Sequence, residues 1–267
     1  MRHGSVGASV LLAALALALG TCGSEDTSGD TSASSGVDLI KDGEIITCTH
    51  LPYQPFQFER GGKIVGFDVD MIDLVAKKLG VKQTVVDTPF EGIKSGEDLN
   101  ARKCDIAAAA MTITPERQQK IVFSAPYFDA NQALLVKKGS GITSLGDLRG
   151  RALGVQSGTT GKLYAEKHAP DGVQLKDYED LALQLSSVKS GQLPAAINDI
   201  PVLLDYVKKN PQLEVAAQFK TGEQYGFGMK KATSQKLEQT VNDVIGQAKA
   251  DGTYDRIYTT WFGARPQ

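Results

Sequence analysis

From about residue 45 onward, short apolar runs alternate with longer segments in which apolar residues recur at helical spacing. In the first long segment, Asp68 can cap the start of a helix and Gly80 can end it. This alternation is typical of a parallel sheet covered by helices, so we expect an α/β fold. The elements predicted in this first unit are a strand over 45–50, a helix over 67–80, a strand over 81–87, a helix over 92–101 and a buried strand over 105–111.

The same alternation restarts after residue 131, which predicts a second α/β unit inserted into the first. Periodicity does not decide whether the last segments return to the first sheet. If they do, two connections cross between the units, and a ligand would bind in the crevice. The further elements predicted are strands over 132–136, 152–156, 174–178, 195–198, 213–219 and 225–229, and helices over 161–168, 181–189, 201–209, 234–250 and 253–262.

The N-terminus carries the pattern of an exported protein. Arg2 precedes ten consecutive apolar residues, 10–19, a run too short to span a bilayer and typical of a signal peptide. We therefore expect residues 1–21 to be a signal peptide. Cys22 opens a polar run and resembles the lipid-modified cysteine of bacterial lipoproteins, so we expect 22–37 to be a flexible, lipid-anchored linker outside the cytoplasm. The alternative is ordinary cleavage that leaves an unpaired thiol.

The net charge limits which partners the chain can bind, and the number of cysteines limits which disulfides it can form. The chain has 29 Lys and Arg against 31 Asp and Glu, so no basic footprint predicts a nucleic-acid partner. Cys48 lies near the end of one predicted strand and Cys104 at the start of another, the run 105–111, and export permits a disulfide between them. If those strands are parallel neighbours, the thiols lie near opposite ends. We therefore favour two buried free thiols and keep the disulfide as the alternative.

Several separated motifs resemble those of family 3 extracellular solute-binding proteins, the amino-acid receptors of ABC importers. The motifs are Phe67-Asp68-Val69-Asp70, the run 111–117, the run 123–127 and the run 251–255. The resemblance spans about residue 40 to 263 and implies a two-lobed type II periplasmic-binding-protein-like fold, with two hinge crossovers and a ligand cleft between the lobes. The implied limits are 38–127 and 228–267 for lobe 1, 132–222 for lobe 2, and 128–131 and 223–227 for the hinges.

Capture of a free amino acid needs one cation and one anion, because either ligand charge left unpaired in a closed cleft is costly. Arg117 stands at the start of a predicted helix, just beyond Thr112, and its guanidinium can grip both oxygens of a carboxylate. The resemblance implies that Arg117 holds the α-carboxylate, assisted by Thr112 and the backbone of Ala110. The alternative is a surface arginine on a polar helix.

Asp199 is the candidate anion. It ends a predicted strand just before Pro201 opens a helix, a place where aspartate also commonly caps a helix. The resemblance implies that Asp199 takes the ligand ammonium. The small-residue turn from Gln156 to Gly161 offers amides to an anion but lacks the spacing of a P-loop. The resemblance implies that Gln156 and Thr159 line the ligand.

The remaining candidates concern the ligand side chain. The resemblance makes Tyr53 and Phe90 aromatic walls, for which core packing is the alternative, and it makes His50 and Gln156 distal polar groups. We leave Phe56 and Phe58 in the core. Such a pocket suits Gln, Asn, Glu or Asp better than Arg or Lys.

We therefore expect a monomeric binding protein that delivers an amino acid to the membrane subunits of an ABC permease, without cofactor or metal. The competing class is a lyase or hydrolase on the same fold, in which cleft carboxylates such as Glu91 or Asp199 would act with His50. The sequence contains no H-E-x-x-H motif, no clustered Cys/His spacing and no G-x-S-x-G elbow, so nothing in it requires catalysis.

Overall fold

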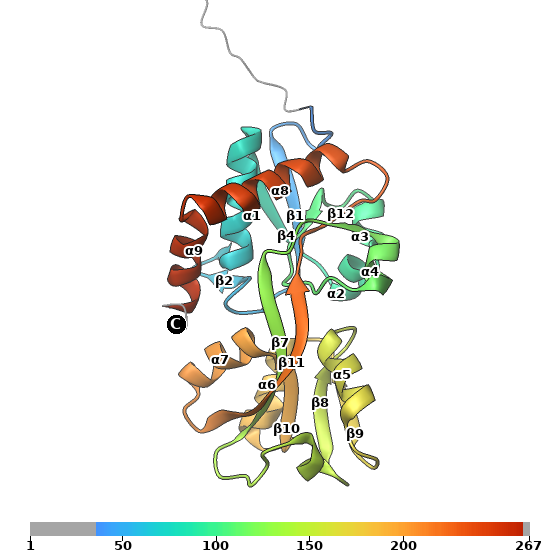
Figure 1. The fold of residues 1–267 in the computed structure, drawn as a ribbon, viewed down its shortest axis with the longest axis vertical. Coiled ribbons are helices and arrows are strands. Elements are labelled where there is room, and N and C mark those ends of the chain that lie inside the picture. The colour runs from blue at the N-terminus through green and yellow to red at the C-terminus, as the bar shows by residue number, and fades with distance from the viewer. Residues whose placement is uncertain (1–35, 264–267) are drawn as a thin grey trace, which may run out of the picture. The chain divides into compact units, whose positions relative to one another are not determined.

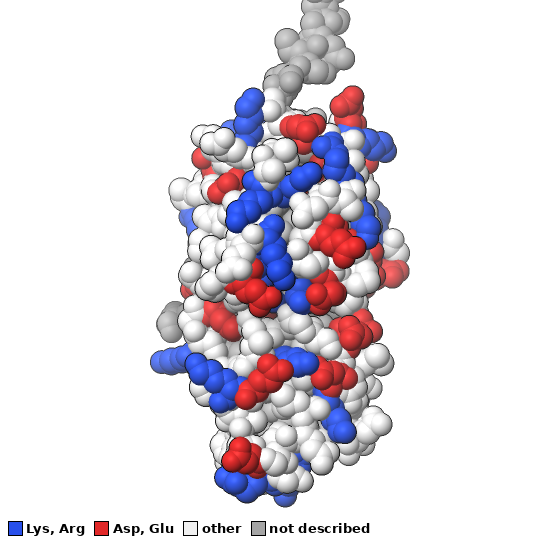
Figure 2. All heavy atoms as spheres, turned by 90° about the vertical axis from the view of Figure 1, so that its right-hand side faces the viewer, with Lys and Arg blue, Asp and Glu red and all other residues white. Residues whose placement is uncertain are grey.

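The computed structural model describes residues 36–263, which fold into two α/β lobes (Figure 1). The predicted signal peptide, Cys22 and nearly all of the predicted linker lie outside the described residues. No helix within 36–263 is long and apolar enough to cross a membrane. The face drawn in Figure 2 carries Lys and Arg interspersed with Asp and Glu rather than a continuous patch of one sign.

Lobe 1 is built on a five-stranded sheet with the order β4-β1-β5-β12-β6. β1 is parallel to β4 and β5, whereas β12 is antiparallel to β5 and β6, so the C-terminal part of the chain does return to the first sheet. The strands are β1 (Glu44–Thr49), β4 (Lys82–Asp87), β5 (Ile106–Ala107), β6 (Val122–Phe123) and β12 (Gly228–Met229), with a small hairpin of β2 (Phe58–Arg60) and β3 (Lys63–Val65) beside them.

The helices of lobe 1 are α1 (Phe67–Leu79), α2 (Phe90–Lys94), α3 (Glu97–Asn100), α4 (Pro115–Lys120), α8 (Gln235–Ala250) and α9 (Thr253–Phe262). The predicted helices at α1, α8 and α9 are confirmed. The single helix predicted over 92–101 is wrong, because Gly96 adopts a left-handed conformation (φ 76°) and divides the segment into α2 and α3.

The start of α1 differs from the sequence prediction. The N-cap is Gly66, where a Cβ would lie 2.0 Å from the carbonyl oxygen of Phe56, and Asp68 does not cap the helix. Asp68 is instead fully buried and accepts hydrogen bonds from the amide of Ala110 (2.8 Å) and the hydroxyl of Tyr127 (2.7 Å). The strand predicted over 105–111 is shorter in the structure, where β5 covers only 106–107, and Ala110 beyond it has a positive φ of 46°.

The prediction of two free thiols is wrong, because Cys48 and Cys104 form a disulfide with a Cα–Cα distance of 5.6 Å. The two strands are parallel neighbours, as assumed, but β5 starts only at Ile106 and pairs with the end of β1 rather than its beginning. The chain bends at Asp105, so Cys104 is not part of the extended run and comes within bridging distance.

Lobe 2 contains a second five-stranded sheet with the order β11-β7-β10-β8-β9. β8 is parallel to β9 and β10, and β7 is antiparallel to β10 and β11. The strands are β7 (Phe128–Lys137), β8 (Ala152–Gln156), β9 (Gln174–Tyr178), β10 (Ala195–Asp199) and β11 (Leu213–Tyr225), and the helices are α5 (Thr160–His168), α6 (Leu181–Ser190) and α7 (Ile200–Lys209), with a 3-10 turn over Leu145–Leu148. The strand predicted over 225–229 is divided, because Tyr225 ends β11 and only 228–229 form β12.

β7 and β11 run side by side from one lobe into the other (Figure 1). Their pairing slips between Phe219 and Glu223, resumes where Glu223 faces Ala130 and continues to Tyr225, which faces Phe128. The two-lobed α/β architecture predicted from the sequence is thus confirmed, while the exact limits of lobes and hinges stay a prediction.

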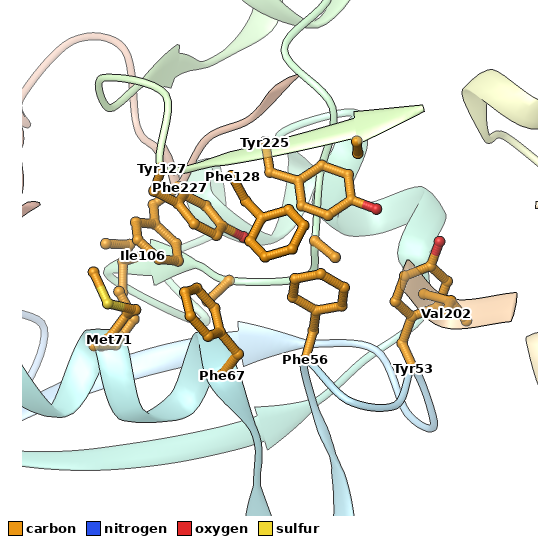
Figure 3. Packing of buried hydrophobic residues seen from close by; sticks show 14 of the residues in the cluster. Tyr53, Phe56, Phe67, Met71, Ile106, Tyr127, Phe128, Val202, Tyr225 and Phe227 are labelled. Carbon is orange, nitrogen blue, oxygen red and sulfur yellow. The ribbon is translucent and has the colours of Figure 1, made fainter. Parts of the chain in front are cut away.

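An aromatic cluster lies where the crossing strands enter lobe 1 (Figure 3). Phe56 meets Phe128 edge to face at 4.9 Å, and Tyr127 stacks on Phe227 at 4.1 Å. Rings packed in this way stabilise the position of the crossing strands where they enter lobe 1. Phe56 is fully buried, which confirms its predicted place in the core. The same prediction is wrong for Phe58, which is only half-buried and lies edge to face with Trp261.

Candidate functional site

A cavity lies between the lobes and is lined by residues of both. All nine residues predicted to contact a ligand line it, together with three that the sequence did not single out. The predicted residues are His50, Tyr53, Phe90, Ala110, Thr112, Arg117, Gln156, Thr159 and Asp199, and the additional ones are Gln57, Ala109 and Thr160.

Arg117 is positioned by the first turn of α4. Thr114 caps this helix by accepting a hydrogen bond from the Arg117 amide, and Pro115 stands in its first turn. The side chain is only 7% exposed, so the alternative of a surface arginine is wrong. Its Nη1 donates to the carbonyl of Thr112 (2.7 Å), its Nη2 donates to the carbonyl of Gly158 (3.1 Å), and the guanidinium lies 5.4 Å from the ring centroid of Phe90.

The guanidinium has no carboxylate partner among its hydrogen bonds within the described residues, and further N–H donors remain for a ligand. Burial lowers the pKa of Arg117, while Asp199 and Glu223 act in the opposite direction. An arginine remains charged under such a shift. The site therefore holds a buried cation that can receive a carboxylate.

The N-terminus of α5, which belongs to lobe 2, faces Arg117 of lobe 1 in the cavity. Thr159 is its N-cap and accepts a hydrogen bond from the amide of Lys162, while the hydroxyls of Thr160 and Thr112 lie 3.3 Å apart. The amides at a helix N-terminus favour an anion. Arg117 from lobe 1 and α5 from lobe 2 thus converge on one place suited to a carboxylate.

Asp199 ends β10, and α7 follows with Pro201 in its first turn. Its side chain makes no capping hydrogen bond, so the helix-cap alternative is wrong. The carboxylate is buried and accepts hydrogen bonds from the hydroxyls of Tyr53 (2.8 Å) and Tyr225 and from Nε2 of Gln132. Burial, with a contribution from the nearby Glu223, raises its pKa to about 6, although the hydrogen bonds act in the opposite direction.

Three residues around Asp199 were missed by sequence reasoning: Gln132, Glu223 and Tyr225. Gln132 and Tyr225 belong to the crossing strands, and Gln132 also donates to Glu223 (2.8 Å). Their order in the sequence gives no signal, because long-range strand pairing brings them together: Gln132 in β7 lies opposite Asp199 in β10, and β11 pairs with the other edge of β7. The anionic side of the cavity is therefore attached directly to the strands that join the lobes.

The predicted distal groups are both present, but the protein already engages them. Nε2 of Gln156 donates to the carbonyl of Glu179 (3.2 Å), and its Oε1 accepts from Asn198 (3.2 Å). Nδ1 of His50 lies 3.0 Å from the carbonyl oxygen of Thr88, and its Nε2 lies 3.4 Å from a carboxylate oxygen of Asp180 in lobe 2.

Contacts across the cavity join the lobes directly. The Tyr53 hydroxyl reaches Asn198 and Asp199, Arg117 reaches Gly158, and His50 faces Asp180. Tyr53 also belongs to the lobe 1 core, so its predicted roles as cavity wall and as core residue hold together. In the part of the chain that the structure describes, no cluster of His, Cys, Asp or Glu could hold a metal ion.

Comparison with known proteins identifies relatives over nearly the whole described chain. The model of the bacterial extracellular solute-binding proteins, family 3, matches residues 45–264. The Escherichia coli K12 ABC transporter arginine-binding protein 1 is 31% identical over 215 residues, 79% of this chain and 87% of its own length. An ABC transporter glutamine-binding protein of Bacillus subtilis 168, GlnH, is 32% identical over 263 residues, 93% of each chain.

Solved structures give the same result. An ancestral arginine-binding protein bound to arginine is 41% identical with a TM-score of 0.77, and covers 83% of this chain and 99% of its own. The structure of an ancestral arginine-binding protein bound to glutamine is 40% identical with a TM-score of 0.78, at coverages of 84% and 99%.

Proposed function

We propose that this chain, which belongs to the bacterial extracellular solute-binding proteins of family 3, captures one free amino acid between its lobes for the membrane permease of an ABC importer. We further propose that Glu, Gln, Asp and Asn are preferred over Arg and Lys. The observation that carries the proposal is that Arg117 and Asp199, of opposite charge and from different lobes, line one cavity. Its relatives are transport binding proteins, and this chain is likewise a transport binding protein and not an enzyme.

The chemistry of the cavity supports an α-amino acid. The α-carboxylate would bind the Arg117 guanidinium, with the hydroxyls of Thr112 and Thr159 and the α5 N-terminus beside it. The α-ammonium would bind Asp199, whose carboxylate is already surrounded by hydroxyl and amide donors. Each buried ligand charge then has an opposite charge at hand, which offsets the cost of removing it from water.

Closure follows if the ligand bridges the lobes. The carboxylate contacts lobe 1 through Arg117, and the ammonium contacts lobe 2 through Asp199, so the ligand binds the closed form better than any open one. We propose that 128–131 in β7 and 223–227 at the end of β11 are the hinges that bend.

The charge count of the lining argues against a lysine or arginine side chain, which is one part of the proposed preference. Within residues 36–263, Asp199 is the carboxylate that lines the cavity, and no other does. The ligand ammonium uses it. A lysine or arginine side chain would then bury a second positive charge without a lining carboxylate, which is costly. Because some relatives are arginine-binding proteins, any test of the preference must compare arginine with the four polar amino acids.

A thermal-shift screen of the purified chain against the twenty amino acids, followed by calorimetry, tests the proposal, because a ligand that prefers the folded state raises its midpoint. We expect the largest shifts from the four polar amino acids. Tight binding of arginine or lysine without a response to those four would overturn the preference. No response to any amino acid would overturn the function itself.

We also propose that Cys22 carries a lipid that anchors the protein to the cell membrane. The family is extracellular, which agrees with export. In detergent phase separation, the wild-type protein should enter the detergent phase and the Cys22→Ser variant the aqueous phase. Wild-type protein in the aqueous phase would contradict the anchor.

A further inference from the structure

Gln57 lines the cavity and carries a buried polar atom without a partner. Its side chain is 1% exposed, and Nε2 donates to the carbonyl oxygen of His50 at 3.5 Å. Its Oε1 has no hydrogen-bond partner among the described residues. A buried acceptor left unpaired carries a free-energy cost, and native structures contain few of them.

The orientation of the Gln57 amide follows from its surroundings. The NH₂ group faces the carbonyl of His50, so exchanging the nitrogen and oxygen would place two acceptors against each other. Oε1 is therefore the atom left over. The other buried unpartnered side-chain atom in residues 36–263 is Oε1 of Gln132, and Gln132 does not line the cavity.

The other polar groups around the cavity are already engaged. Both ends of the Gln156 amide are hydrogen-bonded within the protein, and the Tyr53 hydroxyl reaches Asn198 and Asp199. Arg117 and Asp199 are assigned to the charges shared by every amino acid. Among the described lining residues, Gln57 is the one whose unpaired acceptor can read a ligand side chain.

We propose that Oε1 of Gln57 accepts a hydrogen bond from an N–H donor on the ligand side chain, which makes Gln57 a specificity-determining residue. This rests on the proposed function and narrows it. A primary amide supplies such a donor without a charge. An ionised carboxylate has only acceptors, so one of its oxygens would face Oε1 of Gln57 without a hydrogen bond. The preferred ligands are then glutamine or asparagine rather than glutamate or aspartate.

Calorimetry with L-glutamine and L-glutamate tests the assignment on three proteins: wild type, Gln57→Met and Gln54→Met. Methionine keeps the length of the side chain but lacks the acceptor. Gln54 is the matched control, because it lies in the same segment, contacts Lys209 and does not line the cavity. Each protein is first checked for an unchanged circular dichroism spectrum.

The wild type and Gln54→Met should bind glutamine about tenfold or more tightly than glutamate, the difference expected when a site rejects a ligand that leaves buried polar groups unpaired. Gln57→Met should lose about tenfold or more for glutamine and little for glutamate, so that the preference disappears. An equal loss for both ligands, or an unchanged preference, would overturn the role of Gln57.

A second variant keeps the test open if Gln57→Met does not fold. Gln57→Glu places a carboxylate where the free acceptor stands, so the affinity for arginine relative to glutamine should rise at least tenfold. An unchanged ratio would count against the assignment. Wild-type protein that binds no amino acid at all would instead remove the proposed function, which separates the two failures.

Discussion

Replacing Arg117 with alanine should abolish most of the binding energy for any amino acid ligand. The guanidinium is buried, held by the carbonyls of Thr112 and Gly158, and lies over the ring of Phe90. The arginine is therefore fixed before ligand arrives, and little side-chain entropy remains to be lost on binding. Its removal leaves the ligand carboxylate desolvated and without a cation.

Truncating one member of a buried charge pair costs about 2 to 5 kcal/mol of binding. This corresponds to an increase in Kd of about 30-fold to about 5,000-fold. Arg117→Lys should fall between the wild type and Arg117→Ala, since an ammonium keeps the charge but loses the planar fork. Folding should change little, because the variant also removes a buried charge that the free protein does not pair with a carboxylate.

Isothermal titration calorimetry with L-glutamine measures the loss, and thermal unfolding without ligand measures stability. Arg60→Ala is the control: Arg60 also lies over an aromatic ring, that of Trp261 at 5.0 Å, but it does not line the cavity. It should bind glutamine as the wild type does. A loss of less than tenfold in Arg117→Ala would refute the assignment of Arg117 to the ligand carboxylate.

Three further predictions concern charge and covalent structure. Because burial raises the pKa of Asp199 to about 6 and the ligand ammonium needs the ionised form, glutamine affinity should fall by up to about tenfold per pH unit below pH 6 in calorimetry; constant affinity down to pH 4.5 would contradict this. Burial also raises the pKa of Asp68 to about 7, so the folded state holds more protons than the unfolded state between pH 4 and 7, and the contribution of Asp68 to stability declines as pH rises through that window. The midpoint of Asp68→Asn relative to wild type should therefore rise from pH 5 to pH 8 in thermal scans, and a flat difference would be evidence against it. Replacing Cys48 and Cys104 together with serine should cost about 2 to 5 kcal/mol, or about 4 to 20 °C in midpoint, and an unchanged midpoint would argue against a formed disulfide.

Sequence periodicity predicted helices and strands correctly where the spacing of apolar residues within the segment decides its conformation. The helix at 67–80 is amphipathic over its whole length, so its existence and its end at Gly80 followed directly. Its first residues did not, because the role of Asp68 depends on Ala110 and Tyr127, which lie far away in the sequence. The same contact holds the amide of Ala110, which lies beyond the end of β5 and has a positive φ that local periodicity does not reveal.

The disulfide shows a second limit. The strand that carries Cys48 and the strand that follows Cys104 are parallel neighbours, as the sequence suggested, but the sequence did not show how they are staggered or that Cys104 lies before the strand. Stagger depends on the bend at Asp105, whose carboxylate accepts hydrogen bonds from the amides of Ile40 and Ile46. Such long-range hydrogen bonds leave no trace in local periodicity.

The candidate site divides in the same way. Arg117 and Asp199 were predicted from motifs that resemble those of the family, because local context alone also allowed a surface arginine and a helix-capping aspartate, and both line the cavity. The partners of Asp199 come from paired crossing strands, and the unpaired acceptor of Gln57 is a property of three-dimensional packing alone. The residues that carry charge were therefore predictable, and those that tune the charges or read the side chain were not.

The recognition of both ligand charges is tested most directly by calorimetry with L-glutamine, N-acetyl-L-glutamine and L-glutaminamide on the wild-type protein. Acetylation removes the positive charge that Asp199 would bind, and amidation removes the negative charge that Arg117 would bind. The parent amino acid should bind, and each derivative should bind at least about 100-fold more weakly, because each leaves one buried protein charge unpaired. A derivative that binds within tenfold of glutamine would show that its missing charge is not recognised.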